Sequence, residues 1–186
     1  MIRFAALAAT AVLFTSPGLA ATELNLPPFS GINVHGGGEV KLVYGPQQRV
    51  TVIKSDPKTA EITVVGNTLN LSPCTGMCWG RHDLVVEVTT PRLETLSVHG
   101  GGTLTTQGEF PKQQRLRIDV HGGGEADLRG MPVDDISADV HGGGELHVKP
   151  IHALNAEVHG GGEVTYVGHP AILNSRTHGG GSVSGE

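Results

Sequence analysis

Six histidines, each followed by three glycines, are the residues of this chain whose type and spacing could do chemistry. From the second copy onward they are 22, 20, 18 and 19 residues apart, and the first copy lies 64 residues before the second. Imidazole is the commonest protein ligand for zinc, copper and nickel, so a regular series of histidines predicts a metal-binding surface. The six candidate ligands are His35, His99, His121, His141, His159 and His178.

The repeat length decides whether these histidines can act together. A unit of ~20 residues is too small to bury its own core, so neighbouring units are expected to stack. Stacked in register, the imidazoles would form a ladder with ~4.8 Å spacing, in which two adjacent rings can reach one ion. The alternative is a ladder of neutral rings that covers the sheet and specifies its register. A second column is expected on the same exterior side: Glu39, Glu125, Glu145 and Glu163.

The two cysteines form a second candidate pair. Cys74 and Cys78 enclose three residues. In an oxidising compartment, a pair this close favours a small disulfide loop. The alternative is a metal site in which His82 is a third ligand, because thiolates bind soft metals.

Catalytic arrangements are weak in this sequence, so we expect no enzyme and no catalytic residues. The His-Gly-Gly-Gly run is similar to the oxyanion-hole segment of some esterases, but it occurs six times and no Gly-x-Ser-x-Gly elbow accompanies it. The nearest candidates for polysaccharide cleavage are Asp134 with Asp135, and Asp119 with Arg117. Both groups have the character of solvated surface charge. No cofactor is expected beyond a zinc, copper or nickel ion.

Composition indicates a repeat protein of one domain. The chain has 186 residues, and 18 of its 28 glycines lie in the six triplets. Glycine in blocks excludes collagen, and 38 % hydrophobic residues argue against disorder. A formal net charge of −5 gives no basic footprint for a general nucleic-acid binder.

The segments before the later histidines alternate apolar and polar residues, which is the period of a half-buried β-strand. One example is Leu116, Ile118 and Val120, and the same pattern recurs before His141 and His159. We therefore expect an all-β fold, a right-handed parallel β-helix or β-solenoid with an antiparallel, strand-rich N-terminal part. Residues 24–90 would form that part and cover one end, residues 91–186 would form the repeat coils, and residues 21–186 would make a single domain.

Residues 1–20 have the pattern of a secretory signal peptide. Arg3 supplies the positive start, residues 4–14 are apolar, and small residues precede a cut before Ala21. We expect its removal to leave no membrane span and to place the protein in the periplasm, in the medium or at the cell surface.

The chain resembles the head-GIN-domain family, a family of unknown function described as putative auto-transporter adhesins. The resemblance depends on residues 29–34 (Phe-Ser-Gly-Ile-Asn-Val), on residues 89–96 (Thr-Thr-Pro-Arg-Leu-Glu-Thr-Leu) and on the returning glycine-rich turns. It covers nearly all of residues 24–186 and implies a right-handed β-helix with a strand-rich beginning. The family's turns are usually Ser-Gly-Ser-Gly-like, whereas this chain has His-Gly-Gly-Gly. The family offers no catalytic residues to carry over.

Together these features predict an exported, non-enzymatic protein with an interaction or adhesion-type surface. Its partner, protein or glycan, is unknown. The alternative is a periplasmic protein that binds transition metals through the histidine ladder.

Overall fold

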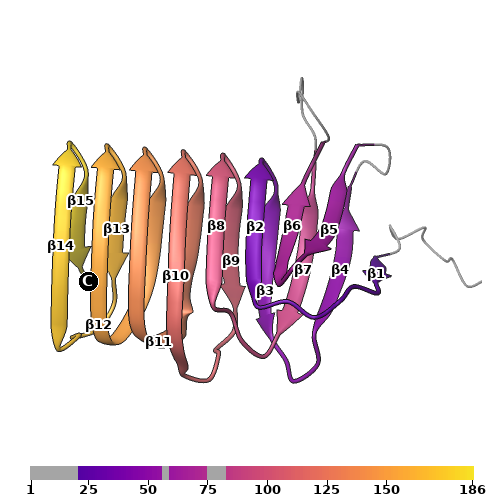
Figure 1. The fold of residues 1–186 in the computed structure, drawn as a ribbon, viewed down its shortest axis with the longest axis horizontal. Helices are drawn as coiled ribbons and strands as arrows, with labels where there is room; N and C mark the ends of the chain where they lie inside the picture. The colour runs from indigo at the N-terminus through magenta and orange to yellow at the C-terminus, as the bar shows by residue number, and fades with distance from the viewer. Residues whose placement is uncertain (1–20, 56–58, 75–82) are drawn as a thin grey trace, which may run out of the picture.

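The computed structural model describes residues 21–55, 59–74 and 83–186, and these residues form β-strands and connecting loops (Figure 1). The expected signal peptide lies outside the described residues. The strands are β1 (Thr22–Leu24), β2 (Gly31–Gly36), β3 (Glu39–Tyr44), β4 (Arg49–Lys54), β5 (Glu61–Val65), β6 (Thr68–Ser72), β7 (Val85–Thr90), β8 (Thr95–Gly100), β9 (Thr103–Gln107), β10 (Gln113–Gly122), β11 (Glu125–Gly142), β12 (Glu145–Gly160), β13 (Glu163–Tyr166), β14 (Ile172–Gly179) and β15 (Ser182–Gly185).

All of these strands belong to one sheet. Its main path runs β1-β4-β7-β3-β9-β11-β10-β8-β2-β6-β5, and β12 to β15 extend it beyond β11. Strands β11 and β12 are long enough to serve both layers of the folded sheet, since β11 pairs with β9 near its start and with β10 near its end. The sheet therefore curls over on itself, and β2, near the chain start, lies between β6 and β8 (Figure 1).

The expected right-handed parallel β-helix or β-solenoid was wrong, although the all-β class is confirmed. The chain forms a curled sheet of mixed parallel and antiparallel strands. The pairs β1–β4, β4–β7 and β5–β6 are antiparallel, whereas β2 pairs in parallel with β6 and β8. For β5–β6 the reason is local, because the two-residue turn at Gly66 and Asn67 reverses the chain into a hairpin. The other two antiparallel pairs join strands that are far apart in the sequence.

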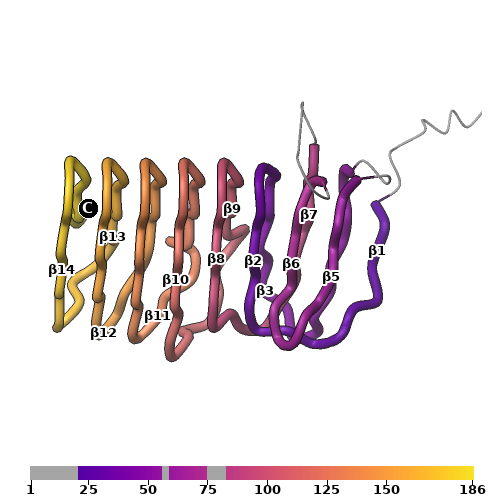
Figure 2. Tube along the Cα trace, turned by 45° about the horizontal axis from the view of Figure 1, so that its top comes forward, coloured from indigo at the N-terminus to yellow at the C-terminus, as the bar shows by residue number. Residues whose placement is uncertain are grey.

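The triple-glycine blocks form the corners where the chain passes from one layer to the other (Figure 2). At Gly122 the backbone has φ +106°, and an added Cβ would lie 2.9 Å from the carbonyl oxygen of Gly100. At Gly124 an added Cβ would lie 2.6 Å from Cγ1 of Val98. An added Cβ at the middle residue, Gly123, would meet nothing within 4 Å. The first and third glycines therefore allow adjacent corners to approach closely, and the middle one faces open space.

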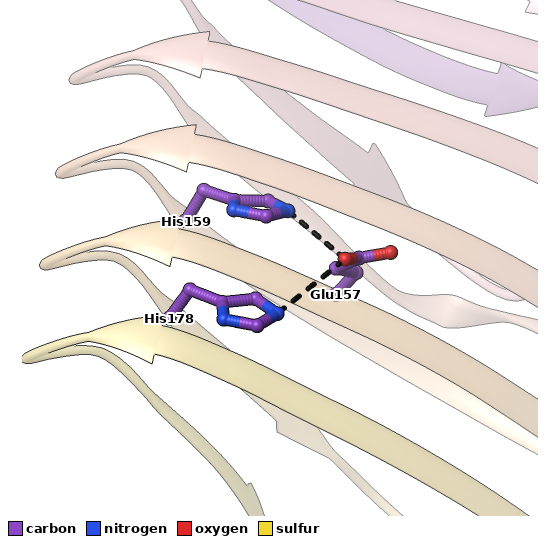
Figure 3. A group of neighbouring side chains, drawn as sticks. All are labelled: Glu157, His159 and His178. Atoms are coloured by element: carbon purple, nitrogen blue, oxygen red, sulfur yellow. Dashed lines mark hydrogen bonds and ion pairs between the residues drawn. The ribbon is translucent and has the colours of Figure 1, made fainter.

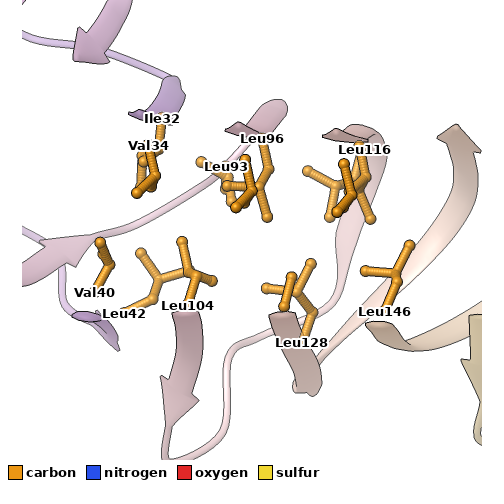
Figure 4. Close-up of a cluster of buried hydrophobic side chains, with 14 of the residues drawn as sticks. Ile32, Val34, Val40, Leu42, Leu93, Leu96, Leu104, Leu116, Leu128 and Leu146 are labelled. Carbon is orange, nitrogen blue, oxygen red and sulfur yellow. The ribbon is translucent and has the colours of Figure 1, made fainter. Parts of the chain in front are cut away.

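The core lies between the two layers and is apolar along its whole length. In the first five repeats, the valine before the histidine and the apolar residue that follows the glutamate or Thr103 point inward, as Val34 and Val40 do in Figure 4. In the sixth repeat the histidine follows Thr177, which is exposed. Leucines from both layers fill the space between them. Fully buried examples are Leu42, Leu96, Leu104, Leu116, Leu128 and Leu146. Burying alternate residues of each strand leaves the other half, including the histidines, on the outer surface.

Candidate functional site

The six histidines occupy neighbouring strands in direct register, as the repeat predicts. His35 on β2 pairs with His99 on β8, which pairs with His121 on β10. The series continues through β11, β12 and β14, where the paired residues are His141, His159 and His178. We call these six side chains the histidine ladder.

The rings of the histidine ladder are stacked face to face. Centroid separations from His35 to His178 are, in order, 5.1, 5.0, 4.7, 4.7 and 4.9 Å. The interplanar angles are 2–3° in the pairs around His141 and rise to 11° and 13° at the two ends. The predicted geometry of the ladder is thus confirmed, and metal binding by it stays a prediction.

The glutamate column does not share this face, so that expectation was wrong. Glu39 is on β3, which pairs with β7 and β9 rather than with β2, so it lies in the layer opposite His35. Glu125, Glu145 and Glu163 stand in register with one another in the same opposite layer. The glycine corner separates each histidine from the next glutamate, and therefore the two columns face away from each other.

A polar column runs beside the histidine ladder, and sequence reasoning missed it. Each member lies two residues before a histidine and shares its face, because strand side chains alternate. Its acidic part consists of Asp119, Asp139 and Glu157 on neighbouring strands. The period of two could have revealed this column. Its six members are Asn33, Ser97, Asp119, Asp139, Glu157 and Arg176.

One arginine forms ion pairs with two of the three carboxylates in the polar column. Arg117 Nη2 lies 3.1 Å from Asp119 Oδ1 and 3.1 Å from Asp139 Oδ2. At the other end of the face, Asn33 Nδ2 lies 2.8 Å from His35 Nε2. These contacts leave Glu157 as the acidic member that contacts the histidines directly.

Glu157 joins the last two histidines into a cluster (Figure 3). Its Oε1 lies 3.0 Å from His159 Nε2 and 3.8 Å from His178 Nε2. The three ligand atoms lie within 4.8 Å of one another, and no other group of this kind occurs in the described ranges. The cluster is therefore the part of the ladder with a metal-compatible donor set.

His99, the second member of the ladder, has a lowered pKa. Partial burial lowers the pKa of His99, and the positive charges that His35 and His121 acquire on protonation lower it further. The carboxylate of Asp119 acts in the opposite direction. Burial, together with the two neighbouring histidines, thus favours the neutral form of His99.

The other sequence candidates lie apart from this face or cannot be placed. Cys74 is buried, whereas Cys78 lies outside the described residues, as does His82, so the disulfide stays a prediction. Asp134 forms an ion pair with Lys112 at 3.0 Å, and Asp135 lies 2.8 Å from His152 Nδ1. The two aspartates are thus engaged with different partners.

The fold and this face define a class: an all-β protein of stacked, glycine-cornered repeats that presents a ladder of identical side chains. The family model described as "Putative auto-transporter adhesin, head GIN domain" matches residues 28–115 and 112–170. The chain belongs to this family.

Two solved structures to which this chain is similar are named as putative adhesins. A putative adhesin from Bacteroides fragilis is 15% identical with a TM-score of 0.54, and the match covers 92% of this chain and 98% of that one. A putative adhesin from Parabacteroides merdae is 14% identical with a TM-score of 0.45, covering 91% of this chain and 97% of that one. The first likeness shows a shared fold.

No curated protein matches the sequence. Among residues 21–55, 59–74 and 83–186, no helix is long and apolar enough to cross a membrane.

Proposed function

We propose that the protein is an exported, non-enzymatic interaction module of the adhesion type. Its binding surface is the face that carries the histidine ladder and the polar column beside it. The partner is a protein or a glycan at a cell surface. Membership of a family described as adhesins supports an exported or cell-surface location.

The observation that carries this proposal is the regular stack of six imidazoles on the outer face. Neighbouring rings are 4.7–5.1 Å apart on paired strands, so the face offers the same group at regular intervals. Backbone pairing between the strands holds this surface in place before a partner binds. The free-energy cost of ordering the protein on binding is therefore small.

The chemistry of this face suits polar partners. A further column lies two residues before the polar column on each strand. It contains Ser137, Asn155 and Asn174, in register on β11, β12 and β14. Hydroxyl and amide groups both donate and accept hydrogen bonds, as sugar hydroxyls and polar protein surfaces require. Asn174 Nδ2 already donates to Asn155 Oδ1 at 2.8 Å, which aligns the two amides along the column.

The test is binding of the untagged chain from Ala21 onward to glycan arrays and to intact bacterial and host cells. We expect a saturable signal that His121→Ala combined with His141→Ala reduces by about 10-fold or more. The matched control is Glu125→Ala with Glu145→Ala, which removes the two glutamates that follow the same glycine corners in the opposite layer, on β11 and β12, and should retain binding. Failure to bind any surface, or equal loss in both double variants, would overturn the proposal.

The second candidate function, transition-metal binding, is favoured at one place in the part of the chain that the structure describes. The cluster of Glu157, His159 and His178 supports it.

A further inference from the structure

We infer that Glu157, His159 and His178 form a binding site for one divalent transition-metal ion of the zinc class. The site lies at the C-terminal end of the histidine ladder, between β12 and β14. It lies on the face proposed for adhesion, but it does not depend on that function, because all three donors come from this chain.

The donor atoms already lie close to the separations that such an ion needs. Tetrahedral zinc with bonds of ~2.0–2.2 Å separates its ligand atoms by about 3.3–3.5 Å. Glu157 Oε1 lies 3.0 Å from His159 Nε2 and 3.8 Å from His178 Nε2, which brackets that separation. The whole set fits within 4.8 Å.

Binding requires the two imidazoles to converge, and the structure leaves them room to do so. The side chain of His178 is 61% exposed, and β14 has a paired neighbour on one side only among the described strands. The rings of His159 and His178 are tilted by 13°, the largest angle in the ladder. Because His178 is largely exposed, we expect its ring to rotate about the side-chain torsions when an ion is bound by the other two donors.

The donor set selects the class of ion. Two imidazoles and one carboxylate suit zinc, copper and nickel, whereas calcium and magnesium prefer oxygen ligands alone. Three protein ligands leave a fourth position for water or for a donor from a partner.

The same arrangement does not recur along the ladder. Asp119 and Asp139 also precede histidines by two residues, but Arg117 pairs with both of them. In the first two repeats that position is held by Asn33 and Ser97, which lack a carboxylate. Glu157 is also longer than aspartate by one methylene, and that length lets its carboxylate reach the imidazole of His159.

The test is isothermal titration calorimetry of the untagged chain from Ala21 onward with Zn²⁺, after treatment with a chelator. We expect one saturable site per chain and no heat of binding for Ca²⁺ or Mg²⁺. Glu157→Gln and His178→Asn should each weaken Zn²⁺ binding by at least about 10-fold, since even groups that only orient a metal ligand cost that much. The matched control, His99→Asn, removes a ladder imidazole whose neighbour is Ser97 and should leave the affinity unchanged.

A second measurement keeps the inference testable if a variant folds poorly. Zn²⁺ added to the unmodified chain should shift the imidazole NMR signals of His159 and His178 and leave those of His35 and His99 in place. Three results would overturn the inference: no saturable Zn²⁺ binding, full affinity in Glu157→Gln, or equal loss in His99→Asn. Zinc binding that survives in the His121→Ala and His141→Ala double variant, while surface binding is lost, would separate this site from the adhesion surface.

Discussion

At the scale of single residues, the three glycines of each repeat differ in what they require. The third glycine packs under the corner of the adjacent repeat, where an added Cβ on Gly144 would lie 2.7 Å from Cγ1 of Val120. An added Cβ on Gly143 would meet nothing within 4 Å. Close packing therefore explains why the third residue of each block is glycine. It does not explain why the middle residue is glycine, because no neighbouring atom would contact its Cβ.

This difference predicts opposite outcomes for the same substitution one residue apart. Gly144→Ala should lower the free energy of unfolding by about 1–3 kcal/mol, because the methyl group overpacks a buried valine. Gly143→Ala should change it by less than about 0.5 kcal/mol, as a surface substitution does. Urea unfolding followed by circular dichroism measures both, and equal destabilisation would contradict the packing role of the third glycine.

At the scale of strands, the position of a leucine within the stack sets its contribution. Leu146 on β12 is fully buried between the layers, whereas Leu173 on β14 is 43% exposed. The two strands are neighbours in the sheet, with register contacts such as Leu154 to Leu173. Stability is therefore expected to fall toward the β14 edge.

The corresponding prediction compares one substitution on these two strands. Leu146→Ala should cost about 2–5 kcal/mol, because it removes buried methyl groups and leaves a cavity. Leu173→Ala should cost less than about 1 kcal/mol, because water already reaches much of its side chain. Chemical unfolding of both variants measures the two free energies of unfolding. A decrease for Leu173→Ala as large as that for Leu146→Ala would show that β14 is covered in solution.

The strands and the ladder could be predicted because they depend on local pattern. Alternation located strands such as β10, and identical motifs indicated which histidines would pair. The sheet topology could not be predicted in the same way, since parallel and antiparallel neighbours have the same alternation and differ only in long-range pairing. The Glu157 cluster was not predicted either. It depends on a carboxylate two residues before a histidine on the same face, and on Arg117 pairing with the equivalent carboxylates of Asp119 and Asp139.

At the scale of the whole molecule, the lowered pKa of His99 links the stability of the fold to pH. The pKa of His99 lies below its ordinary value of 6.5, owing to burial and to the charges of His35 and His121, with Asp119 opposing. The unfolded chain then binds more protons than the folded one below that pH. This contribution to stability is full above about pH 6.5 and is lost as the pH falls toward the folded pKa.

We therefore expect a lower melting temperature at pH 5 than at pH 7.5, measured with a chelator present. One pair of neighbouring charges in water costs about 1 kcal/mol, which corresponds to about 2–4 °C for a chain of this size. His99→Asn should reduce the difference, and high salt should reduce it through screening. An unchanged melting temperature across this range would count against charge repulsion in the ladder.

The even separation of the stacked rings has a consequence for how strongly a repetitive partner is held. Consider a polymer that forms one weak contact with each successive imidazole. Once the first contact has formed, every later contact is intramolecular. Effective concentrations in such arrangements reach millimolar values, and avidity can exceed a single affinity by about 10²–10⁴. A monomeric fragment of the same polymer would gain none of this, so retention by this protein would depend on chain length more than on the chemistry of any one unit.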